Sequence, residues 1–167
     1  MKHHVAIGVG GNIGDSRRIF ADAGKLLEQG GMSGIRMASI IVTKPVDCVP
    51  GTPDFLNSAV IGEWGGTPQE LLALMQSIEQ AMGRPVSHSS HESRPLDLDL
   101  LLMDDLTLDE PTLTIPHPRM CERRFVLKPL AELEPDWLIP GVGKTVGECL
   151  EQLNRANCRE DHCDASV

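Results

Sequence analysis

Apolar residues recur along the chain with two different spacings, which predict a mixture of strands and helices. Four apolar runs have the length and composition typical of strands, at 4–10, 35–43, 55–64 and 96–103. Between them, two segments repeat apolar residues every three or four positions, which is the spacing of one helix face. The predicted order is strand, helix, strand, strand, helix, strand, followed by an irregular segment and further helices.

Capping residues indicate where the helices begin. Asp15 or Ser16 precedes the first apolar stripe, and such residues accept hydrogen bonds from the free backbone N–H groups of a first turn. The second helix has stronger signals, because Thr67 can act as N-cap, Pro68 fits the first helical position and Glu70 completes a capping box. We therefore expect helices directly after these two points.

This order of elements is that of a split βαβ fold. We predict an α+β fold with a ferredoxin-like βαββαβ core, in which helices pack on a mainly antiparallel sheet as three αβα layers. A generic α+β sandwich is the alternative. One domain is expected over 1–156, with 157–167 as a frayed C-terminal tail.

Charge and cysteine content narrow the class of protein. The 167 residues include 15 Lys and Arg against 24 Asp and Glu, a net charge of −9. Phosphate-backbone binding depends on Lys and Arg, so nucleic acid is not expected as a partner.

No apolar run approaches the ~18 residues of a membrane span. Five scattered cysteines suit a reducing compartment rather than a disulfide framework. We expect a cytoplasmic monomer that binds no membrane.

An acidic pair lies at the start of the last predicted strand, within Arg94-Pro95-Leu96-Asp97-Leu98-Asp99-Leu100. Because side chains alternate between the faces of a strand, Asp97 and Asp99 project together while the leucines face the core. Carboxylates about 7 Å apart can hold Mg²⁺ through oxygen ligands. Arg94 could neutralise a phosphate bound to the same metal. The alternative is an edge strand with a solvated acidic face.

A cationic cluster follows Pro116. It contains His117, Arg119, Arg123 and Arg124. In a chain with few basic residues, this cluster is a candidate anion site. The alternative is a helix start whose arginines pair with surface acids.

An aromatic and an amide side chain share one face of the third predicted strand. Phe55 could stack on a flat ring, and Asn57 could bind the hydrogen-bonding edge of that ring. An ordinary core Phe is the alternative. The glycine-rich turn 10–14 lacks both the GxGxxG spacing and the P-loop lysine, so neither nucleotide fingerprint is present.

Taken together and in order, these motifs resemble the 6-hydroxymethyl-7,8-dihydropterin pyrophosphokinase family of folate biosynthesis. The likeness extends from the first strand to about Gly147. Five markers carry it: Gly10-Gly11-Asn12-Ile13-Gly14, Pro53-Asp54-Phe55-Leu56-Asn57, Gln76-Ser77-Ile78-Glu79 with Gly83-Arg84, the segment 94–100, and Pro116-His117 with 123–130. Each marker is weak alone, but five in the right order and spacing are specific.

The resemblance implies transfer of the β,γ-pyrophosphoryl group of ATP to the hydroxymethyl oxygen of the pterin, with release of AMP. It implies that 1–156 is one catalytic domain. On the family pattern, Asp97 and Asp99 would hold two Mg²⁺ ions that bridge the ATP phosphates and the attacking hydroxyl.

The resemblance also implies the remaining site residues. The catalytic residues would be Arg84, Arg94, Asp97 and Asp99. ATP would contact Gln76, Arg84, Arg94, Thr114, His117 and Arg123. The pterin would contact Lys44, Pro45, Asp47, Phe55, Asn57 and Phe125, with the two phenylalanines sandwiching its ring.

Three segments depart from the family pattern. The loop 85–93 contains no Lys, Arg or Trp, where the family commonly carries basic residues and a tryptophan that close over ATP. Gly11 stands in place of a serine, and Lys44 occupies a usually neutral or acidic position. We predict a working enzyme with weaker closure over ATP. The alternatives are a non-catalytic or weakly active pterin- or nucleotide-binding paralogue, and a structural domain without a ligand.

Overall fold

The computed structural model describes residues 2–12, 14–44, 54–83 and 95–161, with only the backbone described for 157–161. Its strands are β1 His3–Gly11, β2 Ser33–Met37, β3 Ile41–Thr43, β4 Phe55–Trp64, β5 Asp97–Met103, β6 Leu108–Glu110, β7 Leu113–Ile115, β8 Leu138–Ile139 and β9 Lys144–Thr145. Its helices are α1 Ser16–Gln29, α2 Pro68–Ala81, the 3₁₀ turn η1 Met120–Glu122, α3 Arg124–Leu133 and α4 Val146–Asp161.

The main sheet is antiparallel and has the order β2-β4-β1-β5, with β3 also paired to β4. This is the strand order of a ferredoxin-like βαββαβ core, so the predicted fold class is confirmed. The predicted strand over 35–43 is wrong in one respect, because it forms two strands. The long strand β4 pairs with β2 along one half and β3 along the other, and the Ala38 amide between them donates to the Ala59 carbonyl at 2.9 Å.

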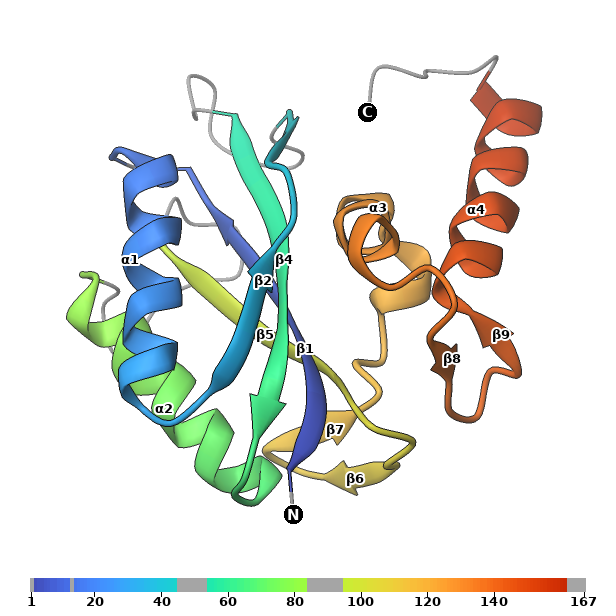
Figure 1. The fold of residues 1–167 in the computed structure, drawn as a ribbon. Coiled ribbons are helices and arrows are strands. Elements are labelled where there is room, and N and C mark those ends of the chain that lie inside the picture. Colours follow the sequence, from blue (N-terminus) through green and yellow to red (C-terminus); the bar gives the residue numbers. More distant parts are fainter. Residues whose placement is uncertain (1, 13, 45–53, 84–94, 162–167) are drawn as a thin grey trace.

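Helices cover both faces of this sheet, which confirms the three predicted layers. Figure 1 shows α1 and α2 on one face and α3 and α4 on the other. Two buried clusters correspond to the two faces: Phe20, Leu27, Leu71 and Met75 pack with Leu98 and Leu100, whereas Leu127, Leu130 and Val146 pack with Leu101 and Leu102. Burying a large aliphatic or aromatic side chain contributes about 1.5–3 kcal/mol, so these two apolar layers hold the helices on the sheet.

The predicted capping signals form as expected. The Thr67 hydroxyl accepts from the Glu70 amide at 3.1 Å, and the Glu70 carboxylate accepts from the Thr67 amide at 2.8 Å. Asp15 caps α1 by accepting from the Arg18 amide at 3.3 Å. Helix α4 continues past 157 to Asp161, into the segment for which the sequence predicts a frayed tail.

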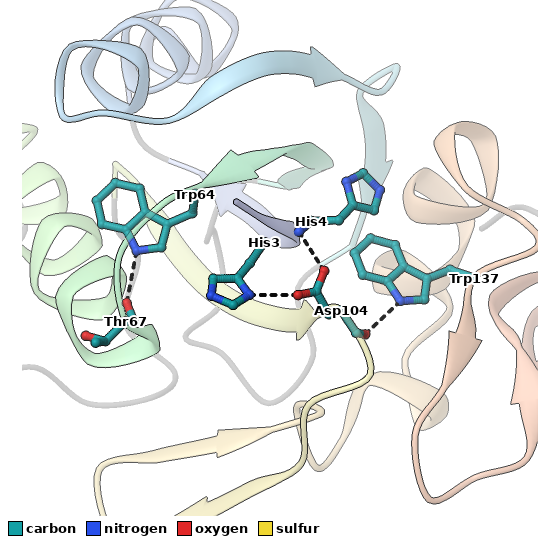
Figure 2. A network of polar contacts seen from close by, with 6 residues as sticks. All are labelled: His3, His4, Trp64, Thr67, Asp104 and Trp137. Atoms are coloured by element: carbon teal, nitrogen blue, oxygen red, sulfur yellow. Dashed lines mark hydrogen bonds and ion pairs between the residues drawn. The ribbon is translucent and has the colours of Figure 1, made fainter. Parts of the chain in front are cut away.

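The end of β5 is joined to both the N-terminal strand and the C-terminal part of the chain (Figure 2). The Asp104 carboxylate accepts from the His4 amide at 2.8 Å and lies 2.7 Å from Nδ1 of His3. The indole of Trp137 donates to the Asp104 carbonyl at 3.2 Å and stacks on the His4 ring, with centroids 4.4 Å apart. This network fixes the end of the edge strand that carries the acidic pair.

Candidate active site

Asn57 and Asp97 lie in one row across the sheet, with Gly10 between them. Gly10 on β1 pairs with Asn57 of β4 on one side and with Asp97 of β5 on the other. Directly paired residues point to the same face of a sheet, so the amide and the carboxylate face the same side. Glycine adds no side chain between them. The candidate ring-binding residue and a candidate metal ligand are therefore neighbours on one surface.

The acidic pair has the alternation that the sequence predicts. Leu98 and Leu100 are buried under α1 and α2, while Asp97 and Asp99 are half-buried. Their carboxylates accordingly belong to the opposite face, the one on which α3 packs. Strand β5 is the last strand of the main sheet, so, among the residues that the structure describes, no strand pairs with its outer edge.

Two groups from outside the sheet bind that edge. Glu79 of α2 is only 9% exposed, and its Oε2 accepts from the Leu98 amide at 2.7 Å. Farther along the edge, the register between β5 and β1 shifts at a β-bulge, in which Leu101 is the extra residue of β5. The Leu101 carbonyl accepts a hydrogen bond from the His117 amide at 3.0 Å. These bonds fix the backbone on which Asp97 and Asp99 stand.

Asn57 is held by a neighbour on β3. The Asn57 side chain is 7% exposed, and its Nδ2 donates to Oγ1 of Thr43 at 3.0 Å. This bond fixes which way the amide points. Because the NH₂ group of Asn57 is directed to Thr43, its Oδ1 lies on the side of Gly10. A Cβ atom added at Gly10 would lie 3.1 Å from this oxygen.

His117 is a neutral hydrogen-bond donor in this environment. Burial lowers the pKa of His117 below its ordinary value of 6.5, and the charges of Arg123 and Arg119 lower it further, while Asp97 partly opposes them. Its Nδ1 accepts from the Arg119 amide at 3.2 Å. The neutral ring therefore carries its proton on Nε2, where it can donate to a ligand.

Arg123 and Phe125 come from the start of α3. The Arg123 guanidinium lies 5.7 Å from the centroid of the Phe125 ring, within the range of a cation–π contact. Thr114 of β7 and His117 both line a pocket of about 510 Å³ between the β6–β7 and β8–β9 hairpins. This volume is typical of small-molecule sites.

The remaining predicted site residues are less closely grouped. Phe55 is half-buried on β4, two residues from Asn57 and thus on the same face. Gln76 is exposed on α2, which lies on the opposite face of the sheet from α3, and Lys44 is exposed directly after β3. Four predicted residues lie outside the described residues, as does the divergent loop 85–93: Pro45, Asp47, Arg84 and Arg94.

Three residues that position the site were not among the predicted site residues. Thr43 orients Asn57, Glu79 binds the backbone between the two aspartates, and Gly10 separates Asn57 from Asp97. Glu79 and Gly10 belong to two of the five motifs on which the family resemblance rests, so the sequence did indicate that both are part of the site. Thr43 had none, because its role depends on the pairing of β3 with β4.

Comparison with known proteins bears directly on this arrangement. A family model described as 7,8-dihydro-6-hydroxymethylpterin-pyrophosphokinase (HPPK) matches residues 6–135. The chain belongs to the HPPK family. The match includes Asn57, Asp97, Asp99, His117 and Arg123, so the site lies within the family's shared region.

Individual relatives agree with the family model. A Synechocystis protein named 2-amino-4-hydroxy-6-hydroxymethyldihydropteridine pyrophosphokinase is 38% identical over 91% of this chain and 77% of the relative. A Bacillus subtilis protein of the same name is 39% identical over 80% of this chain and 79% of the relative. The mitochondrial folate synthesis bifunctional protein of Arabidopsis thaliana is 40% identical over 79% of this chain, which corresponds to only 24% of that protein.

Solved structures show the same fold at lower identity. A structure titled as HPPK-DHPS in complex with substrates has a TM-score of 0.76 and 11% identity, covering 97% of this chain and 45% of that one. A Plasmodium falciparum HPPK-DHPS has a TM-score of 0.77 and 12% identity, covering 98% of this chain and 48% of that one. In both solved chains, the part that matches this fold is somewhat less than half of the chain.

Proposed function

We propose that the chain transfers the pyrophosphoryl group of ATP to the hydroxymethyl group of 6-hydroxymethyl-7,8-dihydropterin, giving the pterin diphosphate and AMP. The observation that carries the proposal is the row formed by Asn57, Gly10 and Asp97. A pterin bound at Asn57 would lie beside the carboxylates that would hold the metal ions and, through them, the phosphates. Membership of the HPPK family supports the same reaction.

The acidic pair fits Mg²⁺. No group of three or more His, Cys, Asp or Glu side chains that could hold a metal occurs within the described residues. Mg²⁺ nevertheless suits the two carboxylates, because it is usually bound by one or two carboxylates together with substrate phosphates and water. Asp97 and Asp99 share a face and stand opposite Gly10 and Gly8, whose positions add no side chain. We propose that these two residues hold two Mg²⁺ ions.

The chain's own groups would then orient the triphosphate. When bound, Mg²⁺ supplies positive charge that offsets charge developing on the phosphates and acidifies the attacking hydroxyl. His117 would donate from Nε2 to a phosphate oxygen, and Arg123 would add a fixed positive charge. Arg84 and Arg94 would complete the catalytic set with Asp97 and Asp99, and Gln76 and Thr114 would contact the nucleotide.

The pterin would bind on the α3 face of the sheet. Asn57, oriented by Thr43, would bind the polar edge of the ring. Phe55 and Phe125 would stack on its two faces, since α3 packs over the face of β4 that carries Phe55. Lys44, Pro45 and Asp47 would complete recognition from the loop that follows β3.

The decisive experiment is an AMP-release assay with ATP, Mg²⁺ and the pterin. We expect AMP and pterin diphosphate in equal amounts, and Asp97→Asn should lower turnover at least a thousandfold while the circular dichroism spectrum stays unchanged. Asp105→Asn is the matched control, since Asp105 is an exposed carboxylate beyond the end of β5. Production of ADP alone would contradict the proposed reaction. Pterin binding without ATP-dependent turnover would favour the non-catalytic alternative.

The wider setting is part of the same proposal. Within the described residues, no helix has the length and apolarity needed to cross a membrane. We propose that the protein acts as a cytoplasmic monomer with 1–156 as its catalytic domain. Sedimentation at micromolar concentration would test the monomer, because a dimer would sediment measurably faster.

A further inference from the structure

Two cysteines outside the proposed catalytic groups lie in direct contact. Cys121 belongs to η1 and Cys149 to α4, and their Sγ atoms are 3.8 Å apart. Both are free thiols. A disulfide needs an S–S separation of about 2.05 Å, so the two sulfur atoms must approach each other before a bond can form. The two residues are 28 positions apart, so a bond between them would join separate elements.

The two thiols differ in their access to solvent. Cys149 is 6% exposed and packs in the cluster beneath α3 and α4. Cys121 is half-buried and lines the pocket that also contains Thr114 and His117. A small oxidant can therefore reach Cys121 through the pocket, while Cys149 is placed to attack the oxidised sulfur from within.

We propose that Cys121 and Cys149 form an oxidation site, at which a peroxide converts the dithiol to an intramolecular disulfide that ties η1 to α4. The Cys121 sulfur attacks one peroxide oxygen, the O–O bond breaks, water leaves and a sulfenic acid forms. The Cys149 sulfur then attacks the Cys121 sulfur, so that the S–S bond forms, the S–O bond breaks and a second water leaves. The two thiols lose two protons and two electrons, and the peroxide accepts both.

The environment makes this reaction slow near neutral pH. Burial raises the pKa of Cys121 to about 11, with further contributions from Cys149 and Glu122. The thiolate is the reactive form, and a raised pKa leaves little thiolate near neutral pH. The pair therefore reacts slowly with peroxide there and faster at alkaline pH. Once formed, the disulfide should stabilise the fold, because it closes a loop in the unfolded chain.

The test uses the full chain with Cys48→Ser, Cys158→Ser and Cys163→Ser, which leaves only the proposed pair. Hydrogen peroxide at mildly alkaline pH should abolish both titratable thiols, lower the mass by two hydrogen atoms and raise Tm. Peptide mapping without reductant should recover the 121–149 link, and dithiothreitol should reverse every change. The matched control adds Cys149→Ala, which should retain the fold and show neither the mass loss nor the rise in Tm.

Three results would overturn the proposal: two titratable thiols that persist in excess peroxide, disulfides only between chains, or over-oxidation of Cys121 without a link to Cys149. Cys121→Ser in the same background provides a second control if the Cys149 variant fails to fold. Its remaining thiol should not form an intramolecular bond.

Discussion

Gly10 and Asn57 lie directly opposite each other on β1 and β4, and a Cβ atom at Gly10 would lie 3.1 Å from Oδ1 of Asn57. Few real Cβ atoms approach a neighbour that closely, so the amide oxygen occupies the space of the missing side chain. The same glycine pairs with Asp97 on its other side. The absence of a side chain at this position thus shapes the surface between the proposed pterin and metal sites.

Gly10→Ala should weaken pterin binding without unfolding the protein. The new methyl group pushes the Asn57 amide oxygen from its position, and we expect KM for the pterin to rise about tenfold, equivalent to ~1.4 kcal/mol. Gly24→Ala is the matched control, because its Cβ would meet only Cε of Met37 at an ordinary 3.6 Å. Steady-state kinetics with varied pterin measure the effect. An unchanged KM in a folded Gly10→Ala protein would contradict the role of this contact.

Thr43→Val should affect the same amide from its other end. Valine has the shape of threonine but cannot accept the 3.0 Å hydrogen bond from Nδ2 of Asn57. A hydrogen bond of this kind contributes about 1 kcal/mol, so KM for the pterin should rise about fivefold with little change in kcat. Val42→Thr, at an adjacent and 49% exposed position, is the reverse substitution and should leave both constants unchanged. Equal effects of the two variants would argue for a general loosening of β3.

Patterns within single elements were sufficient to predict the core and the acidic pair. Leucine alternation around Asp97 and Asp99 indicates the orientation of β5, and the Thr67–Glu70 capping box indicates the start of α2. Both depend on residues a few positions apart. Local periodicity carries such information directly, which is why these parts of the prediction agree with the structure.

Features that depend on register were not predictable in the same way. The division of 35–43 into β2 and β3 arises from pairing with the long strand β4, and the hairpins β6–β7 and β8–β9 have strands too short for a periodic signal. The contact of Thr43 with Asn57 also follows from that pairing. The bond between Glu79 and the Leu98 amide needs the packing of α2 along the sheet edge, which no spacing in the sequence specifies.

Glu79→Leu should test how far that edge bond positions the acidic pair. The substitution leaves the buried Leu98 amide without its acceptor, which should cost about 2 kcal/mol of unfolding free energy. It should also raise the Mg²⁺ concentration for half-maximal activity, because Leu98 stands between the proposed metal ligands. Glu79→Gln keeps an acceptor oxygen and should recover most of both losses.

Gln80→Leu provides the control for the Glu79 series. It introduces the same residue at the next position of α2, where the side chain is exposed. Urea unfolding and activity as a function of Mg²⁺ separate the two effects. A loss of stability with an unchanged Mg²⁺ dependence would mean that Glu79 supports the fold alone.

Asp104→Asn should destabilise the protein in a pH-dependent manner. Partial burial would raise the pKa of Asp104, but the hydrogen bonds from His3 and the His4 amide and the charges of both histidines outweigh it and hold the pKa below 3.8. A carboxyl with a lowered pKa contributes stability that is fully present above its unfolded value and is lost as pH falls through its folded value. The loss in the variant should therefore be about 1 kcal/mol at pH 7, a modest figure because solvent screens this partly exposed group, and it should disappear as the pH falls through the lowered folded-state pKa.

Asparagine suits this position because Asp104 has a φ of 50°, a left-handed conformation that Asn tolerates well. The backbone therefore remains unstrained, and the variant removes the charge and replaces one of the two oxygens that face His3 and the His4 amide with an NH₂ group. Urea unfolding of wild type, Asp104→Asn and the exposed Asp105→Asn at a series of pH values measures the difference. A penalty that stays constant on acidification would show that the hydrogen-bond geometry, and not the charge on Asp104, holds β1, β5 and Trp137 together.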